Sequence, residues 1–320
     1  MKFNNFAEFD RYGDSLAAEG KNDEVLDLFL RASEVLPREE YERQYFVIAS
    51  YTGFLYLKSG REEDLYNVVK NLIDNGYACG NWIIRELSKK EDERYVELLE
   101  KNKLLFIEAQ RNAEMKYSVY LPKGYTPDKK YPVFFALHGD GADGDIYNLS
   151  AYWTPEAFVK NNFILVYVQS SQVYCHGGYQ WNNDINIARK DIRNCLSKVS
   201  EKYSIDKNCL IVGGFSGGAM ASVDFSMDDV IPVKGFVSLC PGDVSNYFSV
   251  EKAEAASNRG IRVVILEGEL ELEPSVQDML KVFDEKGIKY KYEINKGVGH
   301  ICPENLTEKL ENAIKFILDK

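Results

Sequence analysis

From Met115 onward the chain alternates short apolar, β-rich runs with amphipathic stretches, and this alternation restricts the fold more than any other feature. Seven runs have the composition of buried strands: KYSVYLP, YPVFFALH, FILVYVQ, NCLIVGG, KGFVSLC, IRVVILEG and KYKYEIN. Helical periodicity separates them at 186–203 and 274–287 and closes the chain at 303–320, and the last two stretches open with proline. This order predicts an α/β fold with a doubly wound, mostly parallel sheet covered on both faces.

The first 112 residues have a different pattern. Apolar positions recur at spacings of three and four in the segments 23–36, 61–73 and 92–109, and strand-like alternation is absent. We therefore predict two domains, an all-helical one over 1–112 and an α/β one over 113–320.

Part of the helical domain matches itself. When Gly20 is laid on Gly60, a period of 40 residues, Leu28 falls on Val68 and Phe29 on Val69. The match is similar to tetratricopeptide or related helical-hairpin repeats, although its period is irregular. An irregular helical bundle is the alternative.

Composition and charge exclude several classes of function. The apolar and charged fractions, 45% and 28%, are those of a globular protein, and the net charge of −11 disfavours nucleic acid and membrane surfaces as partners. No run approaches the ~18 apolar residues of a membrane span, and no secretory signal opens the chain, so a cytoplasmic location is expected. The six cysteines lack C-x-x-C spacing, and neither zinc-ligand spacing nor a phosphate-binding glycine pattern occurs. We expect no metal and no cofactor.

The segment IVGGFSGGAMAS places Ser216 between Gly214 and Gly218, directly after a strand-like run. The pattern G-x-S-x-G is typical of a strand-to-helix turn that exposes a strained serine as a nucleophile. A glycine-rich turn without chemistry is the alternative. The pattern alone leaves the two open.

The positions of the histidines favour the nucleophilic serine over the plain turn. The chain has only three, and His138 and His176 precede Ser216, whereas His300 follows the last strand-like run. Acyl-transfer enzymes of the α/β class carry their triad in the order serine, acid, histidine. His300 is therefore the candidate base, and a merely solvated loop histidine is the alternative.

Residues from about 115 to the end resemble an α/β-hydrolase of the esterase type. The stretch YSVYLPKGYTPDKKYPVFFALHGDGADG is similar to the opening of esterase D, feruloyl esterase and polyhydroxybutyrate depolymerase-like enzymes, and the phospholipase/carboxylesterase families are also alike. The resemblance implies that the amides of Gly217 and Asp140 form the oxyanion hole. Family members often carry glycine or an apolar residue in place of Asp140, and a carboxylate there would oppose an oxyanion unless it points away.

The resemblance also implies an acid three residues after Gly268, which is Glu271 in this sequence. Because Glu269 and Glu273 flank it, a solvated acidic loop is an alternative. Asp243, after the preceding strand-like run, is the other candidate acid. Four residues are expected beside the substrate cleft, with simple packing as the alternative for the tryptophan: His138, Gly139, Phe215 and Trp181.

These features predict a serine hydrolase that cleaves a small-molecule carboxylic ester through an acyl-enzyme intermediate. A serine peptidase of the prolyl oligopeptidase type has the same order of triad residues and is one alternative. A non-catalytic scaffold that binds a protein through its helical domain is another. The helical domain could also bound the cleft as a cap, or join copies of the chain into a homo-oligomer.

Overall fold

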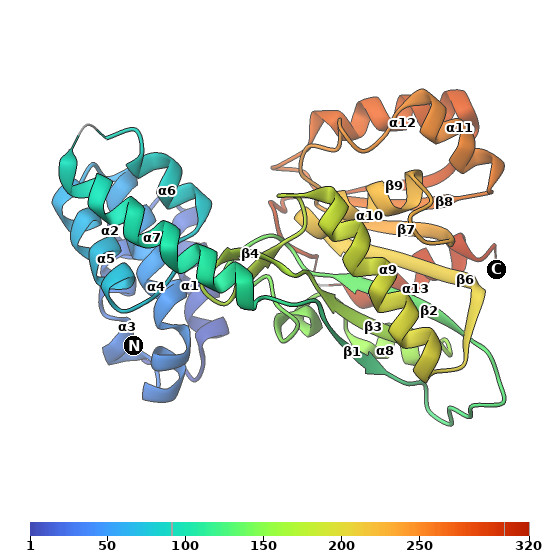
Figure 1. Ribbon diagram of the computed structural model, residues 1–320, viewed down its shortest axis with the longest axis horizontal. Coiled ribbons are helices and arrows are strands. Elements are labelled where there is room, and N and C mark those ends of the chain that lie inside the picture. The colour runs from blue at the N-terminus through green and yellow to red at the C-terminus, as the bar shows by residue number, and fades with distance from the viewer. Residues whose placement is uncertain (91, 304, 320) are drawn as a thin grey trace. The chain divides into compact units, whose positions relative to one another are not determined.

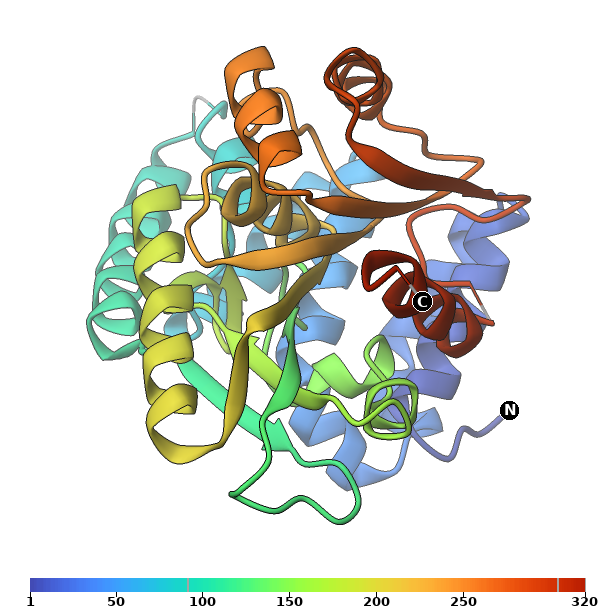
Figure 2. The ribbon, with the colours of Figure 1, turned by 90° about the vertical axis from the view of Figure 1, so that its right-hand side faces the viewer.

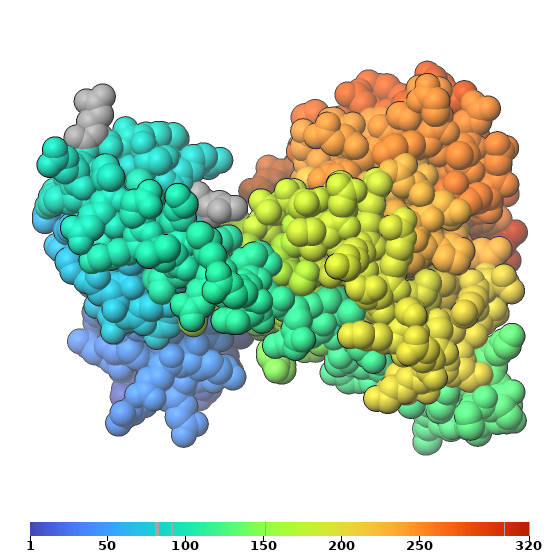
Figure 3. All heavy atoms as spheres, viewed as in Figure 1, coloured from blue at the N-terminus to red at the C-terminus, as the bar shows by residue number. Residues whose placement is uncertain are grey.

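The computed structural model describes residues 1–90, 92–303 and 305–319. The chain divides into two compact units, Met1–Asn112 and Ala113–Lys320, coloured blue to cyan and green to red in Figure 3. Within the described ranges, no helix is both long and apolar enough to cross a lipid bilayer.

The regular elements described in the N-terminal unit are all helices (Figure 1). They are α1 (Phe6–Ala18), α2 (Asn22–Leu30), α3 (Ala32–Val35), α4 (Arg38–Lys58), α5 (Glu62–Asp74), α6 (Asn81–Leu87) and α7 (Glu93–Asn112). Their apolar faces meet in a core of their own, in which Phe9 and Phe29 pack with ring centroids 4.9 Å apart and Val69 and Leu72 are fully buried. The predicted helical domain therefore has its own hydrophobic interior.

The two glycines that define the 40-residue register occupy equivalent turns. Gly20 and Gly60 follow the ends of α1 and α4 with φ values of 75° and 69°, a left-handed conformation that glycine adopts without steric cost. In both turns the residue after the glycine donates its amide to the carbonyl five residues back, as in the Schellman motif. The two turns thus match in detail, and their descent from a repeated unit stays a prediction.

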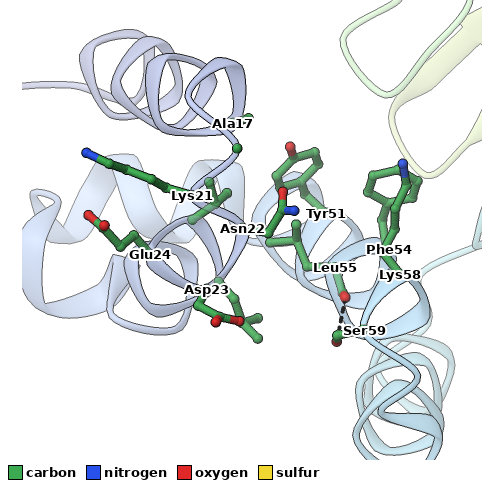
Figure 4. A pocket seen from close by; sticks show the side chains of 13 residues that line it. Ala17, Lys21, Asn22, Asp23, Glu24, Tyr51, Phe54, Leu55, Lys58 and Ser59 are labelled. Carbon is green, nitrogen blue, oxygen red and sulfur yellow. Dashed lines mark hydrogen bonds between the residues drawn. The ribbon is translucent and has the colours of Figure 1, made fainter.

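A pocket of about 750 Å³ lies in this unit between the α1–α2 turn and α4 (Figure 4). Its lining combines the aromatic rings of Tyr51 and Phe54 with the charged side chains of Lys21, Glu24 and Lys58. No histidine or cysteine is among the lining residues. The serine, histidine and acids that the sequence analysis proposes as catalytic all lie in the C-terminal unit.

The C-terminal unit is built on a seven-stranded sheet in the order β1-β3-β2-β6-β7-β8-β9. The strands are β1 (Lys116–Tyr120), β2 (Tyr131–Leu137), β3 (Ile164–Gln169), β6 (Ile205–Phe215), β7 (Val233–Leu239), β8 (Arg262–Gly268) and β9 (Lys289–Asn295). Only β1 is antiparallel to its neighbour, and each strand coincides with one of the seven predicted runs. A separate hairpin of β4 (Gln172–Cys175) and β5 (Gly178–Gln180) was not predicted.

Helices cover both faces of the sheet, as the apolar strands require. Figure 2 shows α9 (Ile185–Lys202) on one side and α8 (Pro155–Val159) and α13 (Leu306–Ile317) on the other. The core on the α9 side also takes buried residues from α10 (Gly217–Met227), α11 (Val250–Asn258) and α12 (Pro274–Lys286). The predicted fold class is confirmed. The start of the last helix differs from the prediction. Pro303 precedes α13 rather than opening it, and its carbonyl accepts the Leu306 amide.

Candidate active site

The carboxyl ends of the parallel strands bring the predicted residues to one edge of the sheet. The register pairs Leu137 of β2 with Gly214 of β6, and Phe215 of β6 with Leu239 of β7. The loops that follow these strands therefore start side by side, where ligands collect in open α/β sheets. Ser216, the loop after β2 that begins with His138 and Gly139, and the segment after β7 meet there.

Ser216 stands between β6 and α10 in a strained conformation. Its φ and ψ are 51° and −117°, which a residue with a side chain rarely adopts and which costs about 1–3 kcal/mol. The Ser216 amide donates to Leu239 O at 2.9 Å, and this bond helps to hold the turn. A Cβ on Gly214 would lie 2.0 Å from the Gly218 backbone, and one on Gly218 would lie 2.3 Å from His138 O. The motif glycines are thus required by close packing of strand, helix and loop.

His300 lies beside the serine turn, in the loop after β9. Its ring centroid is 5.2 Å from that of Phe215, the residue before Ser216, and Phe215 stacks on Tyr152 at 4.8 Å. The next residue, Ile301, accepts a weak hydrogen bond from Cys240 Sγ after β7 at 3.7 Å. His300 is 38% exposed, so its ring is accessible from solvent. The structure therefore brings residues 216 and 300 to the same rim.

Of the two candidate acids, Glu271 is the one that faces the histidine. Its Oε2 lies 3.6 Å from His300 Nδ1, within ion-pair range but longer than a hydrogen bond. Asp243 instead accepts hydrogen bonds from the amide and hydroxyl of Ser245 at 2.9 and 2.5 Å, and these hold the pKa of Asp243 below its ordinary value. The contacts favour Glu271 as the partner of His300.

A buried carboxylate that the sequence analysis did not identify anchors the loop carrying Glu271. Glu267, at the end of β8, is fully buried. Its Oε1 accepts the Glu273 amide at 2.8 Å and its Oε2 accepts the Tyr292 hydroxyl at 2.8 Å, while Asn295 donates to its carbonyl at 3.0 Å. These bonds tie both ends of the acidic loop to β8 and β9. The sequence did hold a sign of this residue, because Glu267 is an acid inside the apolar run IRVVILEG.

Glu267→Gln should stabilise the protein most at high pH. Burial raises the pKa of Glu267 above its ordinary 4.5, so the folded state retains a proton that the unfolded state has lost. Wild-type stability from this group is therefore present below pH 4.5 and is lost as the pH rises toward the raised pKa. Glutamine carries no such charge. The difference in Tm between the variant and the wild type should increase from about pH 4 to about pH 8, measured by calorimetry.

The matched control is Glu285→Gln, which removes an exposed charge from α12. Its Tm difference from the wild type should change little over the same pH range. A Glu267→Gln variant whose advantage is constant or shrinks with rising pH would contradict the burial argument.

His138 supports the loop after β2 rather than lining a cleft, which corrects the prediction for this residue. It is 1% exposed, and burial lowers its pKa to about 4, so the ring is neutral. Nε2 accepts the Ser170 amide at 3.1 Å, which leaves the proton on Nδ1 to bond Gly139 O at 2.7 Å. A neutral imidazole thereby fixes the Gly139 carbonyl.

Trp181 does not line a cleft either, and the alternative of simple packing is the correct interpretation for this residue. Its side chain is fully buried, and its indole N–H donates to His138 O at 3.1 Å. Gly139 and Phe215 do lie beside the serine, because a Cβ on Gly139 would sit 3.0 Å from the Phe215 ring and 3.4 Å from Ser216 Cβ. Of the four residues expected beside the cleft, Gly139 and Phe215 lie next to the serine, and His138 and Trp181 are buried in the interior.

The Asp140 carboxylate bonds within the protein rather than standing free. It accepts the Trp181 amide at 2.7 Å and the Asn182 side-chain amide at 2.9 Å, and burial raises the pKa of Asp140. A Cβ on Gly217 would lie 2.1 Å from the Asp140 carboxyl carbon, so only glycine fits there. Within the described ranges, the amides of Asp140 and Gly217 donate to no protein acceptor.

The described part of the chain holds no group of three histidine, cysteine or acidic side chains placed to ligate a metal ion. The residues that converge here instead fit proton transfer and nucleophilic attack: a strained serine, an accessible imidazole beside a carboxylate, and two adjacent backbone amides.

Comparison with known proteins gave likenesses only among solved structures. No family model and no curated protein matches the sequence. An uncharacterized protein from Bacillus cereus ATCC 10987 is 22% identical with a TM-score of 0.53, and the match covers 98% of this chain and 99% of that one. A Bacillus cereus carboxylesterase is 19% identical with a TM-score of 0.48, covering 66% and 98%. Est1E from Butyrivibrio proteoclasticus, with ferulic acid bound, is 13% identical with a TM-score of 0.46, covering 65% and 96%.

The first of these likenesses concerns the fold, and it extends over both units. Within the C-terminal unit, the largely parallel sheet and the serine on a strained turn from β6 into α10 are the features of the α/β-hydrolase fold. The chain has this fold, preceded by a helical unit.

Proposed function

We propose that the chain is a serine hydrolase that cleaves carboxylic esters through a covalent acyl-enzyme. The observation that carries the proposal is the strained Ser216 turn beside His300, whose Nδ1 lies 3.6 Å from the Glu271 carboxylate. In that arrangement the carboxylate favours the tautomer with a proton on Nδ1. Nε2 is then free to accept the serine proton.

In the first half-reaction, Ser216 Oγ attacks the ester carbonyl carbon while His300 Nε2 takes the hydroxyl proton. The negative charge that develops on the carbonyl oxygen accepts hydrogen bonds from the amides of Gly217 and Asp140. Collapse of this intermediate breaks the bond to the alcohol, which leaves with the proton from His300. The acyl group remains on Ser216.

In the second half-reaction, water attacks the acyl-enzyme and gives its proton to His300, again through an oxyanion held by the two amides. Collapse returns that proton to Ser216 Oγ and releases the carboxylic acid. Each proton removed by His300 is given back, so the reaction needs no cofactor. The resemblance of residues 117–144 to esterases favours an ester over an amide as the bond cleaved.

A fluorophosphonate probe tests the nucleophile directly. The wild-type protein should be labelled covalently on Ser216, because an activated serine oxygen displaces fluoride from the probe and forms a phosphonate ester, and the modified peptide should be identified by mass spectrometry. Ser216→Ala should abolish the label. Labelling at another serine, or none on a folded wild-type protein, would exclude the proposed function.

The choice of ester over peptide is tested with p-nitrophenyl butyrate and a prolyl p-nitroanilide peptide as substrates. The ester should be cleaved and the anilide should not. Cleavage of the anilide with the higher kcat/KM would assign the site to a peptidase instead.

A further inference from the structure

The Asn182 side chain bonds to both residues that are proposed to supply the oxyanion amides, Asp140 after β2 and Gly217 at the start of α10. This residue follows Trp181 at the end of the β4–β5 hairpin and is half-buried. Its Nδ2 lies 2.9 Å from Asp140 Oδ2 and 3.0 Å from Gly217 O. Both atoms are acceptors, and an amide nitrogen carries two hydrogens, so it can donate one to each. One side chain thus contacts both Asp140, in the loop after β2, and Gly217, the residue after Ser216.

A third contact fixes the orientation of this amide. The Tyr247 hydroxyl donates to Asn182 Oδ1 at 3.1 Å, from the segment between β7 and α11. Rotating the amide by 180° would set its oxygen against the Asp140 carboxylate and the Gly217 carbonyl, which are also acceptors. The hydrogen bonds therefore permit only one orientation.

The same contacts explain how an aspartate can occupy position 140, in the loop after β2, where esterases often carry glycine or an apolar residue. One oxygen of Asp140 accepts the Trp181 amide at 2.7 Å and the other accepts Asn182, so both are engaged on the side of the β4–β5 hairpin. The carboxylate is thereby held by donors, while the backbone amide of the same residue has no acceptor in the described part of the chain. Asp140 can serve as an oxyanion donor because its side chain is fixed elsewhere.

We propose that Asn182 is a positioning residue, which sets the distance between the amides of Asp140 and Gly217 by bridging the Asp140 carboxylate and the Gly217 carbonyl. This inference depends on the proposed function, since it gives the bridge a role in stabilising the oxyanion. Asp140 lies in the loop after β2 and Gly217 is the first residue of α10, and the Asn182 side chain links the two. Donors that act on a transition state must be held within about 0.5 Å of their working positions.

Asn182→Ala should lower kcat for p-nitrophenyl butyrate by about 10- to 100-fold, because both oxyanion amides lose their common support. KM should stay within about twofold of the wild-type value, since the oxyanion contacts strengthen only in the transition state. The control is Asn161→Ala, which removes a 2.9 Å bond from a part-buried asparagine to the Ala157 carbonyl in the same unit. Its kcat should match the wild type.

Asn182→Asp separates positioning from space filling. Aspartate keeps the shape of the side chain, but its carboxylate places a third acceptor opposite the Asp140 carboxylate and the Gly217 carbonyl. Above neutral pH, this variant should therefore lose at least as much kcat as Asn182→Ala. At lower pH the ratio of its kcat to that of the wild type should rise, because two neighbouring carboxylates share a proton. A side chain that merely filled space would leave Asn182→Asp active at every pH.

The outcomes separate this inference from the proposed function. Wild-type protein that a fluorophosphonate fails to label would refute the proposed function. Normal labelling together with wild-type kcat in Asn182→Asp would refute the bridge alone. If Asn182→Ala does not fold, Tyr247→Phe replaces it: loss of the 3.1 Å bond to Oδ1 should lower kcat by about two- to fivefold with KM unchanged, and an unaltered kcat counts against the bridge.

Discussion

Ser216→Ala should reduce kcat for p-nitrophenyl butyrate by about 10⁶-fold, which leaves no more than background hydrolysis. The variant removes the oxygen that forms the acyl bond, and no neighbouring group can replace it. The fold should survive, because the strained turn is held by the Ser216 amide and by the motif glycines rather than by the hydroxyl. Alanine has a Cβ like serine, so the backbone strain is unchanged. Initial rates at saturating ester, with circular dichroism as the check of folding, measure the effect.

The double variant Ser216→Ala/His300→Ala shows whether the two side chains act together. A base that serves only this nucleophile has nothing to activate once the hydroxyl is gone, so the second substitution should reduce kcat no further. His300→Ala alone should be nearly as inactive as Ser216→Ala. If the losses of the two single variants multiplied in the double variant, residues 216 and 300 would be acting independently and the triad would be wrong.

Glu271→Gln should lower kcat by about 10³- to 10⁴-fold, a smaller loss than that of Ser216→Ala or His300→Ala. Glutamine preserves the size of the side chain, but its NH₂ group can face His300 Nδ1 and favour the tautomer that cannot accept the serine proton. The pair is partly exposed, with the carboxylate side chain 60% accessible, so water can replace part of its effect. Steady-state kinetics on the same ester would measure the loss.

Asp243→Asn is the matched control, because it makes the same chemical change in the other candidate acid. Asp243 is occupied by Ser245, so its variant should retain kcat within about threefold of the wild type. The reverse result, an active Glu271→Gln and an inactive Asp243→Asn, would transfer the acid to the end of β7.

Several elements could be predicted from local patterns because their causes are local. The inner strand runs, such as YPVFFALH and FILVYVQ, are nearly all apolar, and a strand that is buried on both faces can be recognised without knowing its partners. The turn at Ser216 was visible because only glycine tolerates the contacts at Gly214 and Gly218. The order of Ser216 and His300 followed from the small number of histidines.

Other features could not be predicted, because they depend on which loops meet. The exposure of His138 and Trp181 is set by packing between the β2 loop and the β4–β5 hairpin, which no periodicity shows. Glu267 was overlooked because its partners, Glu273 and Tyr292, come from a loop and the next strand. Pro303 marked a turn before α13 rather than its first residue, since proline suits both positions.

Local patterns were enough to predict the fold class and to single out Ser216 and His300 as the proposed nucleophile and base, because apolar runs and the glycines around the serine are properties of short segments. Which acid faces His300, and the link from Asn182 to Asp140 and Gly217, became known from the three-dimensional contacts. Those contacts join residues up to 42 positions apart, and their lengths depend on how the strands are ordered and how far each loop reaches.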